Sequence, residues 1–375
     1  MIPTFHPVVG GAQNNCYHLA RELAKKHDVS VYCSGNKDET ETVENIKVFR
    51  CKVTASYSYY LTLYPSLKKI LDQKFDIIHI HGFGFVQQDD VIKRIKRKYP
   101  NTKLVCTPHG PFMALKYNFF KTMLKKAYTK VVKKVVKEID IIIKVNPYQD
   151  DWMMSEYDIP KSKIRLLPNG IPNETFERID FATVDKVCKK YGLTNKFVLT
   201  YVGRIQKYKG LDQMIKLLPK MKKDVVFVII GKDGGDQTRL QNLAKELKVE
   251  KRVIFTGFIE EEEKLSLLEK ARIFIFPSEW EAFGIGTLEA MAKGAAIIST
   301  KTEGGKYLIG INNGRLFDYG DIDGLKKQLD KLIYNTKERI RIGAINIKKA
   351  KEFRWEEIVK ELEQIYNKLH TELKK

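Results

Sequence analysis

The sequence predicts an α/β protein built from two doubly wound domains, and three observations lead to this prediction. Short continuous runs of β-branched residues recur along the chain, each followed by a turn and a stretch with helical periodicity. A connector with little strand pattern, residues 171–195, separates two such blocks. The length of 375 residues exceeds what a single hydrophobic core usually organises.

The first block opens on a glycine turn rather than on a strand. The turn VVGGAQ covers residues 8–13 and leads into a helix over residues 12–26. A doubly wound domain normally begins with a buried strand, and residues 1–7 are too short and too interrupted by proline to supply it. We therefore expect that the natural chain begins upstream of Met1 and that the first strand is missing or truncated here.

Apolar runs then mark the strands of both domains. The first domain, residues 1–178, has such runs at residues 28–34, 46–53, 76–82, 103–107, 139–145 and 164–167. The second domain, residues 196–352, has them at residues 197–202, 225–230, 253–258, 273–276 and 296–299. Because continuous apolar runs are typical of strands covered on both faces, we expect parallel sheets. Ligands of such sheets bind at the carboxyl ends of the strands, so the expected site is a cleft between the domains.

Two helices complete the predicted organisation. A short helix over residues 180–191 interrupts the connector. A long amphipathic helix over residues 355–373 closes the chain within a terminal segment, residues 353–375. The sequence leaves open whether this last helix caps the second domain or crosses back to the first.

The composition is typical of a cytoplasmic globular protein, with 43% hydrophobic and 30% charged residues. No apolar run reaches the roughly 18 residues of a membrane span, and the first residues lack a signal-peptide pattern. The cysteines are scattered without a CxxC pair, which indicates free thiols and argues against a metal cage. They are Cys16, Cys33, Cys51, Cys106 and Cys188.

A net charge of +21 raises the question of nucleic acid or an anionic membrane as a partner. Only 14 of the 67 basic residues are arginine, the residue on which nucleic-acid readers rely for bidentate contacts. We therefore expect no nucleic-acid partner. A lysine-rich composition by itself accounts for the charge.

Two glycine-containing turns are candidate anion sites. Gly10 and Gly11 lead directly into a helix, whose amino-terminal amides favour an anion, although an ordinary tight turn would look the same. The segment GRIQKYKG, residues 203–210, follows the first strand of the second block. Its Arg204 and Lys209 suit a diphosphate, whereas its Lys207 is expected to be solvated.

The third candidate is the segment PSEWEAFGIGTLEAMAKG, residues 277–294. If a helix begins near residue 283, Gly284 and Gly286 lie at its start, Glu281 lies in the preceding loop, and Glu289 lies one turn inside. Carboxylates would repel a diphosphate, so they are expected to bind the hydroxyl groups at its two ends. The alternative is that both glutamates are solvated on a helix face. A sugar nucleotide fits the segment better than ATP does.

Together these segments resemble the retaining family 4 glycosyltransferases of the GT-B fold, over nearly the whole chain. The most specific part is the pair of glutamates with seven residues between them, Glu281 and Glu289, together with GxxxxxKG at residues 203–210. Supporting segments occur in the order usual for the family, namely VVGGAQ, DIIHIHG (76–82), TPHG (107–110) and PNGI (168–171).

The resemblance implies a reaction and a set of roles. A sugar passes from a nucleoside-diphosphate sugar, most simply a UDP- or GDP-sugar, to a saccharide or lipid-linked acceptor with retention and without a required cofactor or metal. Arg204 and Lys209 would bind the diphosphate, Glu289 the ribose, and Glu281 and His109 the transferred sugar. The remaining donor-binding positions would be Gly10, Gly11, Gly203, Gly284, Ile285, Gly286 and Thr287.

Rival functions remain at this point. A sugar-nucleotide epimerase of the same build would need acid–base groups in the cleft, and a non-catalytic nucleotide-sugar binder would keep Arg204, Lys209 and Glu289 without transfer. A nicotinamide dehydrogenase is not supported, because no GxGxxG follows an initial strand.

His79 and His81 lie on one strand, and we expect them to face opposite sides.

Residues 117–139 form the clearest amphipathic stretch of the first domain. We expect Phe120, Leu124, Ala127, Val131 and Val135 on its apolar face and Lys126, Lys130, Lys133, Lys134 and Lys137 opposite. The lysines are either solvated or bind anionic lipid at the inner face of the cell membrane.

The acceptor is expected to bind near Phe112, Met113 and Tyr117.

Overall fold

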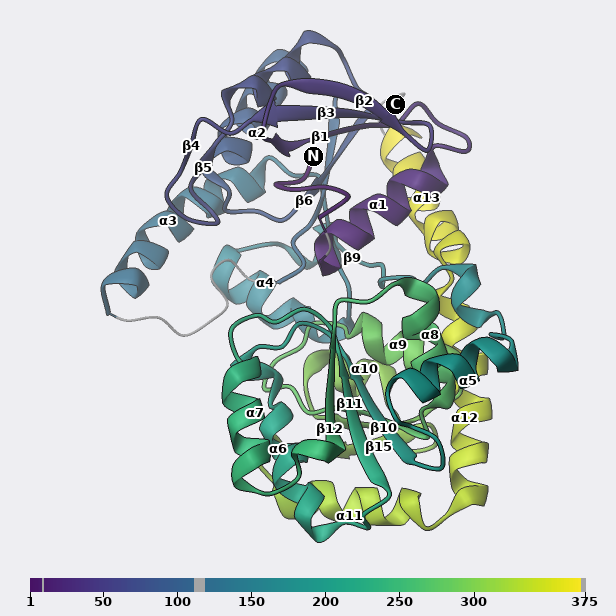
Figure 1. Cartoon of the computed structure of the whole chain (residues 1–375). Helices are drawn as coiled ribbons and strands as arrows, with labels where there is room; N and C mark the ends of the chain where they lie inside the picture. The colour runs from purple at the N-terminus through teal and green to yellow at the C-terminus, as the bar shows by residue number, and fades with distance from the viewer. Residues whose placement is uncertain (9, 111–118, 372–375) are drawn as a thin grey trace. The chain divides into compact units, whose positions relative to one another are not determined.

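A computed structural model describes residues 1–8, 10–110 and 119–371 (Figure 1). The chain divides into two compact units, and we describe each by itself. Unit 1 comprises Met1–Gly170 and Trp355–Lys375, and unit 2 comprises Ile171–Arg354. Over the described ranges, no helix combines the length and the apolar character that crossing a membrane requires.

The described residues of unit 1 form two main sheets. In the first, β1 (Ser30–Gly35) pairs in parallel with β3 (Ile46–Lys52), and β2 (Glu39–Val43) pairs antiparallel at the other edge of β3. The second sheet is parallel, in the order β6-β7-β8-β9. Its strands are Ile77–His81, Lys103–Thr107, Ile141–Lys144 and Ile164–Leu166. A small hairpin is formed by β4 (Ala55–Ser56) and β5 (Thr62–Leu63).

Residues 1–3 lie between β1 and β6. The Ile2 amide donates to the Tyr32 carbonyl at 3.1 Å, and the His81 amide donates to the Met1 carbonyl at 2.9 Å. The Met1 amino group donates to the carbonyl of His79 at 2.7 Å. These residues do not form a regular strand, yet they hydrogen-bond to a strand on each side and thereby link the two sheets.

Five helices surround the sheets of unit 1 in the part of the chain that the structure describes. They are α1 (Gly11–Leu23), α2 (Val86–Lys98), α3 (Phe119–Lys137), α4 (Asp150–Tyr157) and α13 (Trp355–Thr371). The last of these settles an open question, because α13 packs against α1 within unit 1 (Figure 1). A buried apolar cluster holds it there, formed by Leu19, Val105, Ile141, Ile143, Leu167, Trp355, Ile358, Val359, Leu362 and Leu369.

The apolar face of α3 differs from the one expected from the sequence. Val132, Val135 and Val136 are buried, whereas Ala127 is exposed and Val131 is half-buried. Val135 is buried as expected, whereas Val132 and Val136 are buried in place of Ala127 and Val131, which places the centre of the buried face to one side of the expected one. Most of the lysines are exposed as expected, but Lys133 forms an ion pair with Asp158 at 2.8 Å. The side chains of Phe120 and Leu124 are outside the described part.

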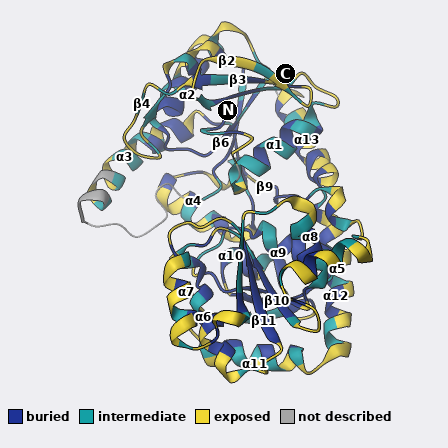
Figure 2. Ribbon diagram, viewed as in Figure 1, coloured by how far each residue is buried: buried dark blue, intermediate teal, exposed yellow. Residues whose placement is uncertain are grey.

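Unit 2 is built on one parallel sheet in the order β12-β11-β10-β13-β14-β15. Its strands are β10 (Phe197–Val202), β11 (Val225–Ile230), β12 (Val253–Gly257), β13 (Ile273–Phe276), β14 (Ala296–Thr300) and β15 (Gly314–Phe317). The central strands are buried along most of their length, as Figure 2 shows for β10 and β11. This confirms that continuous apolar runs indicate strands covered on both faces.

Helices cover both faces of this sheet in unit 2. They are α5 (Phe181–Lys190), α6 (Leu211–Leu217), α7 (Gln237–Glu246), α8 (Glu261–Lys270), α9 (Ile285–Ala292), α10 (Glu303–Leu308), α11 (Ile322–Ile333) and α12 (Thr336–Ala350). The helix expected in the connector is α5, and the Asp180 side chain caps it by accepting from the Thr183 amide.

Candidate functional site

The candidate site of unit 2 lies at the carboxyl ends of two neighbouring strands. β10 and β13 pair in parallel, so the loops that follow them leave the same edge of the sheet. The first loop carries Gly203, Arg204 and Lys209, and the second carries Glu281 and ends at α9. A backbone hydrogen bond from the Glu279 amide to the Tyr208 carbonyl, 2.7 Å long, ties the two loops together.

Two different structural features explain why glycine occupies positions 284 and 286 at the start of α9. Gly284 is the N-cap and has φ +93°, a conformation that favours glycine. At Gly286, a Cβ atom would lie 2.7 Å from the carbonyl oxygen of Val202, so glycine there lets α9 pack against the end of β10. Ile285 and Gly286 lie in the first turn, where amides have no acceptor within the helix and can face an anion.

Lys209 and Glu281 form a shielded ion pair. The Lys209 Nζ atom lies 2.6 Å from the Glu281 Oε2 atom, and their side chains are 10% and 17% exposed. The Lys209 ammonium also lies over the rings of Tyr208 and Phe276, with Nζ 4.8 Å and 5.2 Å from their centroids. Burial works against the charged form, but the Glu281 carboxylate outweighs it and raises the pKa of Lys209. The lysine is therefore a fixed positive charge.

Glu289 is held in a similar way by a lysine that the sequence analysis did not identify. The Nζ atom of Lys264, on α8, lies 2.8 Å from the Glu289 Oε1 atom. Burial raises the pKa of the Glu289 carboxyl group, and the charge of Lys264 opposes that effect. Each glutamate of the pair thus has its own lysine. The only signal in the sequence was a lysine directly after four glutamates, which no motif distinguishes.

The other predicted positions of unit 2 differ in exposure. Arg204 is exposed, as is Lys207, in agreement with the solvated position expected for the latter. Gly203 directly follows β10, and its amide donates to the Ile230 carbonyl at 2.9 Å. Thr287 is buried in the first turn of α9, where its amide donates to the carbonyl of Gly284 at 3.0 Å. The first turn of α9 therefore lies beside a fixed cation and an exposed arginine loop.

In unit 1, the predicted glycine turn leads into a helix as expected. Gly10 is the N-cap of α1, and its carbonyl accepts from the Asn14 amide at 2.8 Å. A Cβ atom at Gly11 would meet nothing within 4 Å, so the space around this residue is open. The helix ends at Leu23, three residues before the expected end.

His109 belongs to a row of three histidines at the end of β6 and β7. It adopts a left-handed backbone conformation with φ +61°, and its Nε2 atom lies 3.1 Å from Nδ1 of His81. The rings of His79 and His81 stack with their centroids 4.6 Å apart, so the expectation that they face opposite sides was wrong. Residues two apart on a strand share a face, because side chains alternate with a period of two.

Burial keeps these hydrogen-bonded histidines neutral. Nε2 of His79 lies 2.8 Å from the Thr107 hydroxyl and its Nδ1 lies 2.6 Å from the Tyr366 hydroxyl. Burial lowers the pKa of His79 to about 3 and that of His109 to about 4, and it also lowers the pKa of His81. A neutral imidazole can both donate and accept a hydrogen bond, which suits contact with a sugar hydroxyl.

This row of histidines predicts acid sensitivity. An unfolded histidine binds a proton below its ordinary pKa of 6.5, whereas these folded residues stay neutral. The histidines should therefore contribute their full share to the free energy of unfolding above pH 6.5, and this contribution should fall as the pH drops toward about 4. Between pH 6.5 and 5 the loss should approach about 2 kcal/mol for each histidine. Thermal unfolding at pH 7.5, 6 and 5 measures it. His79→Gln should flatten the dependence, and the exposed control His370→Gln should not; equal slopes would contradict the assignment.

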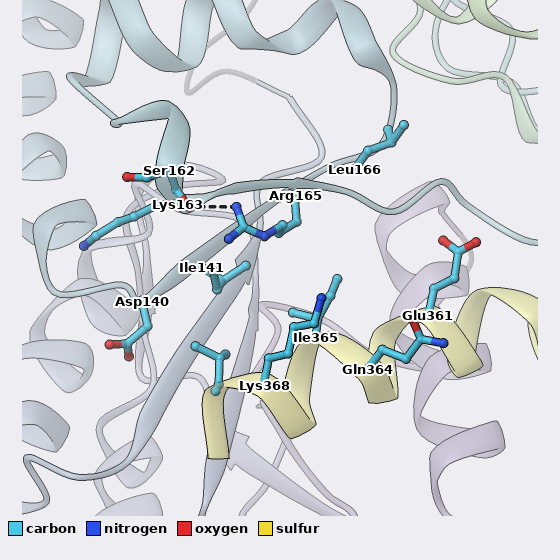
Figure 3. A pocket seen from close by; sticks show the side chains of 11 residues that line it. Asp140, Ile141, Ser162, Lys163, Arg165, Leu166, Glu361, Gln364, Ile365 and Lys368 are labelled. Atoms are coloured by element: carbon cyan, nitrogen blue, oxygen red, sulfur yellow. Dashed lines mark hydrogen bonds between the residues drawn. The ribbon is translucent and has the colours of Figure 1, made fainter. Parts of the chain in front are cut away.

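No group of three or more metal-ligating side chains is close enough to hold a metal ion in the residues that the structure describes. The positions expected for the acceptor, Phe112, Met113 and Tyr117, lie outside the described residues. A cavity of about 520 Å³ does occur in unit 1, but none of the predicted site residues lines it. It lies between β9 and α13, with Lys163, Arg165 and Lys368 among its lining residues (Figure 3).

Comparison with known families covers both halves of the chain. The model of the family described as "Glycosyltransferase Family 4" matches residues 9–175, and that of "Glycosyl transferases group 1" matches residues 185–349. A curated relative, an uncharacterised glycosyltransferase of Methanocaldococcus jannaschii, is 25% identical over 97% of this chain and 96% of its own.

Solved structures show the same fold. The sucrose-phosphate synthase of Thermosynechococcus elongatus superposes with a TM-score of 0.80 at 19% identity, over 97% of this chain and 94% of that one. The Anabaena protein HepE, solved in complex with UDP and glucose, superposes with a TM-score of 0.78 at 17% identity, over 98% of both chains. The two family models together match most of the chain, and the superpositions show that it has the same fold as these solved structures.

Proposed function

Because the chain belongs to glycosyltransferase family 4 and has the GT-B fold, we propose that it transfers a hexose-type sugar from a nucleoside-diphosphate sugar to an acceptor hydroxyl, with retention of the anomeric configuration. The observation that carries the proposal is the contact between Lys209, Glu281 and the start of α9. Glu281 Cγ lies 3.7 Å from the Cβ position of Gly284, so a fixed cation and a carboxylate adjoin free helix amides. HepE, a structural neighbour, binds UDP and glucose.

In this proposal the residues of unit 2 hold the donor. The free amides of Ile285 and Gly286, with Arg204 and Lys209, bind the diphosphate. Thr287 lies beside them in the same turn, where its own amide is bonded to Gly284. Glu289 accepts hydrogen bonds from the ribose hydroxyls, and Glu281 contacts the transferred sugar. In unit 1, Gly10, Gly11 and His109 are the proposed donor-binding residues, and the neutral His109 imidazole can donate or accept a hydrogen bond.

The chemical step needs charge stabilisation more than a protein acid or base. The bond from the anomeric carbon to the phosphate oxygen breaks, and the acceptor oxygen forms its bond on the same face. The acceptor proton passes to the departing phosphate, so the atoms and charges balance. Lys209 and the α9 amides stabilise the negative charge that develops on that phosphate, and such stabilisation is usually the main source of rate enhancement in a site of this kind.

A ligand panel tests the donor site. Thermal unfolding is measured with UDP, GDP and ADP and with their glucose conjugates, for the wild type and for Arg204→Ala. A nucleotide at about 100 times its Kd should stabilise the wild type by about 2.7 kcal/mol, a shift of several degrees, and the variant by much less. No shift with any nucleotide would contradict the proposal. Binding without transfer to any acceptor would leave a nucleotide-sugar binder instead.

We also propose that the exposed lysines of α3 bind an anionic membrane that carries a lipid-linked acceptor. Lys126, Lys130, Lys134 and Lys137 are exposed at intervals of three and four residues, so they form one stripe. Flotation with phosphatidylglycerol vesicles should recover the wild type at low salt and lose Lys130→Glu/Lys134→Glu. Lys220→Glu/Lys223→Glu, exposed positions in unit 2 with the same change in charge, is the matched control. Equal loss in both would contradict a specific surface.

A further inference from the structure

Lys264 lies where both helix electrostatics and burial disfavour a cation. It is in the first turns of α8, directly after Glu261, Glu262 and Glu263. The amino-terminal end of a helix favours negative charge, so a lysine there gains nothing from the helix dipole. Its side chain is only 15% exposed, which removes most of the hydration of the ammonium group. Something specific must compensate.

The compensation comes from two carboxylates on either side of the ammonium group. Nζ of Lys264 lies 2.8 Å from Glu289 Oε1 and 2.8 Å from Glu261 Oε2. Glu289 is 11% exposed and Glu261 is 61% exposed, so the inner partner is shielded and the outer partner is in water. Their combined charge outweighs the effect of burial and raises the pKa of Lys264.

The hydrogen bond from Lys264 involves one of the two oxygen atoms of the Glu289 carboxylate. Oε1 accepts the hydrogen bond from Lys264, and the lysine does not occupy Oε2. A carboxylate accepts through both oxygens when ionised, but when protonated it becomes in part a donor. Burial raises the pKa of Glu289 and thereby favours the protonated form. The positive charge of Lys264 acts in the opposite direction and favours the ionised form.

We propose that Lys264 is a positioning residue that keeps Glu289 ionised and turns its Oε2 atom toward the 2′- and 3′-hydroxyl groups of the donor's ribose. The inference rests on the proposed function, in which Glu289 binds that ribose. Glu261 contacts the same ammonium from the solvent side and limits its movement. Lys264 thereby determines how strongly the protein distinguishes a ribose from a sugar without these hydroxyls.

Calorimetric titration with matched nucleotides tests this role. UDP and 2′,3′-dideoxy-UDP, and the corresponding GDP pair, are titrated into the wild type, Lys264→Met, Lys264→Arg and the control Lys270→Met on the same helix. The wild type should prefer the ribose form by about ten- to a hundredfold, because hydrogen bonds to a charged group are the strong ones. Lys264→Met should lose most of that preference at pH 6.5, regain part of it at pH 8.5, and bind the dideoxy form as the wild type does. Lys264→Arg and Lys270→Met should retain the preference.

The outcomes separate this inference from the proposed function. If the wild type binds none of the nucleotides of the ligand panel, the nucleotide site itself is wrong and the inference falls with it. If the wild type binds but Lys264→Met keeps the full ribose preference at both pH values, Lys264 does not position Glu289. Equal weakening of the ribose and dideoxy forms would indicate a loss of folded structure and would also overturn the positioning role, and the melting temperature of each variant identifies that case.

Discussion

Lys209→Met should reduce sugar transfer by about a hundred- to a thousandfold, the usual cost of removing one group that stabilises charge in a transition state. The same change should lower stability. It leaves the Glu281 carboxylate, 17% exposed, without its partner. Breaking a buried pair in this way costs about 3–5 kcal/mol, and the partial exposure of Glu281 puts the expected loss at the lower end. Initial rates with the donor found in the ligand panel and thermal unfolding measure the two effects.

A second variant tests whether the lost stability comes from the unpaired carboxylate. Lys209→Met/Glu281→Gln removes both charges of the pair, so most of the lost stability should return while transfer stays low. Lys207→Met is the matched control, because Lys207 is an exposed lysine of the same loop. It should change stability by less than about 0.5 kcal/mol and leave transfer unchanged. Recovery of transfer in the double variant would show that Lys209 acts only on the fold.

Glu281→Gln should change binding and catalysis in opposite directions. The Lys209 ammonium, now held by the carboxylate at 2.6 Å, becomes fully available to an anion. Removing a negative charge beside a bound diphosphate removes a repulsion, which is worth about 3 kcal/mol for two unit charges ~6 Å apart at an effective dielectric constant of 20. Free nucleotide should therefore bind about tenfold or more tightly. Transfer should fall by about a hundredfold, because the carboxylate no longer contacts the sugar.

Calorimetry with free UDP or GDP and initial-rate measurements test both parts. Glu279→Gln is the control, since Glu279 is an exposed carboxylate of the same loop and the net charge changes equally. Weaker nucleotide binding in Glu281→Gln would contradict competition between the carboxylate and the diphosphate. An equal gain in both variants would indicate a general effect of net charge rather than release of Lys209.

Several strands of the unit 2 sheet could be predicted closely from the sequence. β10, β11 and β13 have the expected bounds, because continuous β-branched runs bounded by turns have no competing helical pattern. The strands that were missed lack such runs. β2 (ETETV) is polar and half-exposed, and β15 (GRLF) is short. Both are outermost strands of their sheets, where one side of the strand has no partner and the sequence signal is weak.

The two errors about faces have separate causes. For His79 and His81 the periodicity of a strand was misapplied, and the stacked rings show that the two residues share a face. For α3, several apolar residues surround the helix, and a shift of one residue changes which of them are buried. The expected Val135 is buried, but only packing against the rest of unit 1 selects Val132 and Val136 beside it.

By itself, the sequence determined the fold class, the order of the motifs and the glutamate pair, because these depend on local periodicity and spacing. The tertiary structure decided which charges meet. Lys209 reaches Glu281 across 72 positions of sequence, and Lys264 reaches Glu289 across 25. It also decided that α13 packs within unit 1. Contacts of this kind depend on how strands and helices are ordered in space, and no local pattern encodes a partner so far along the chain.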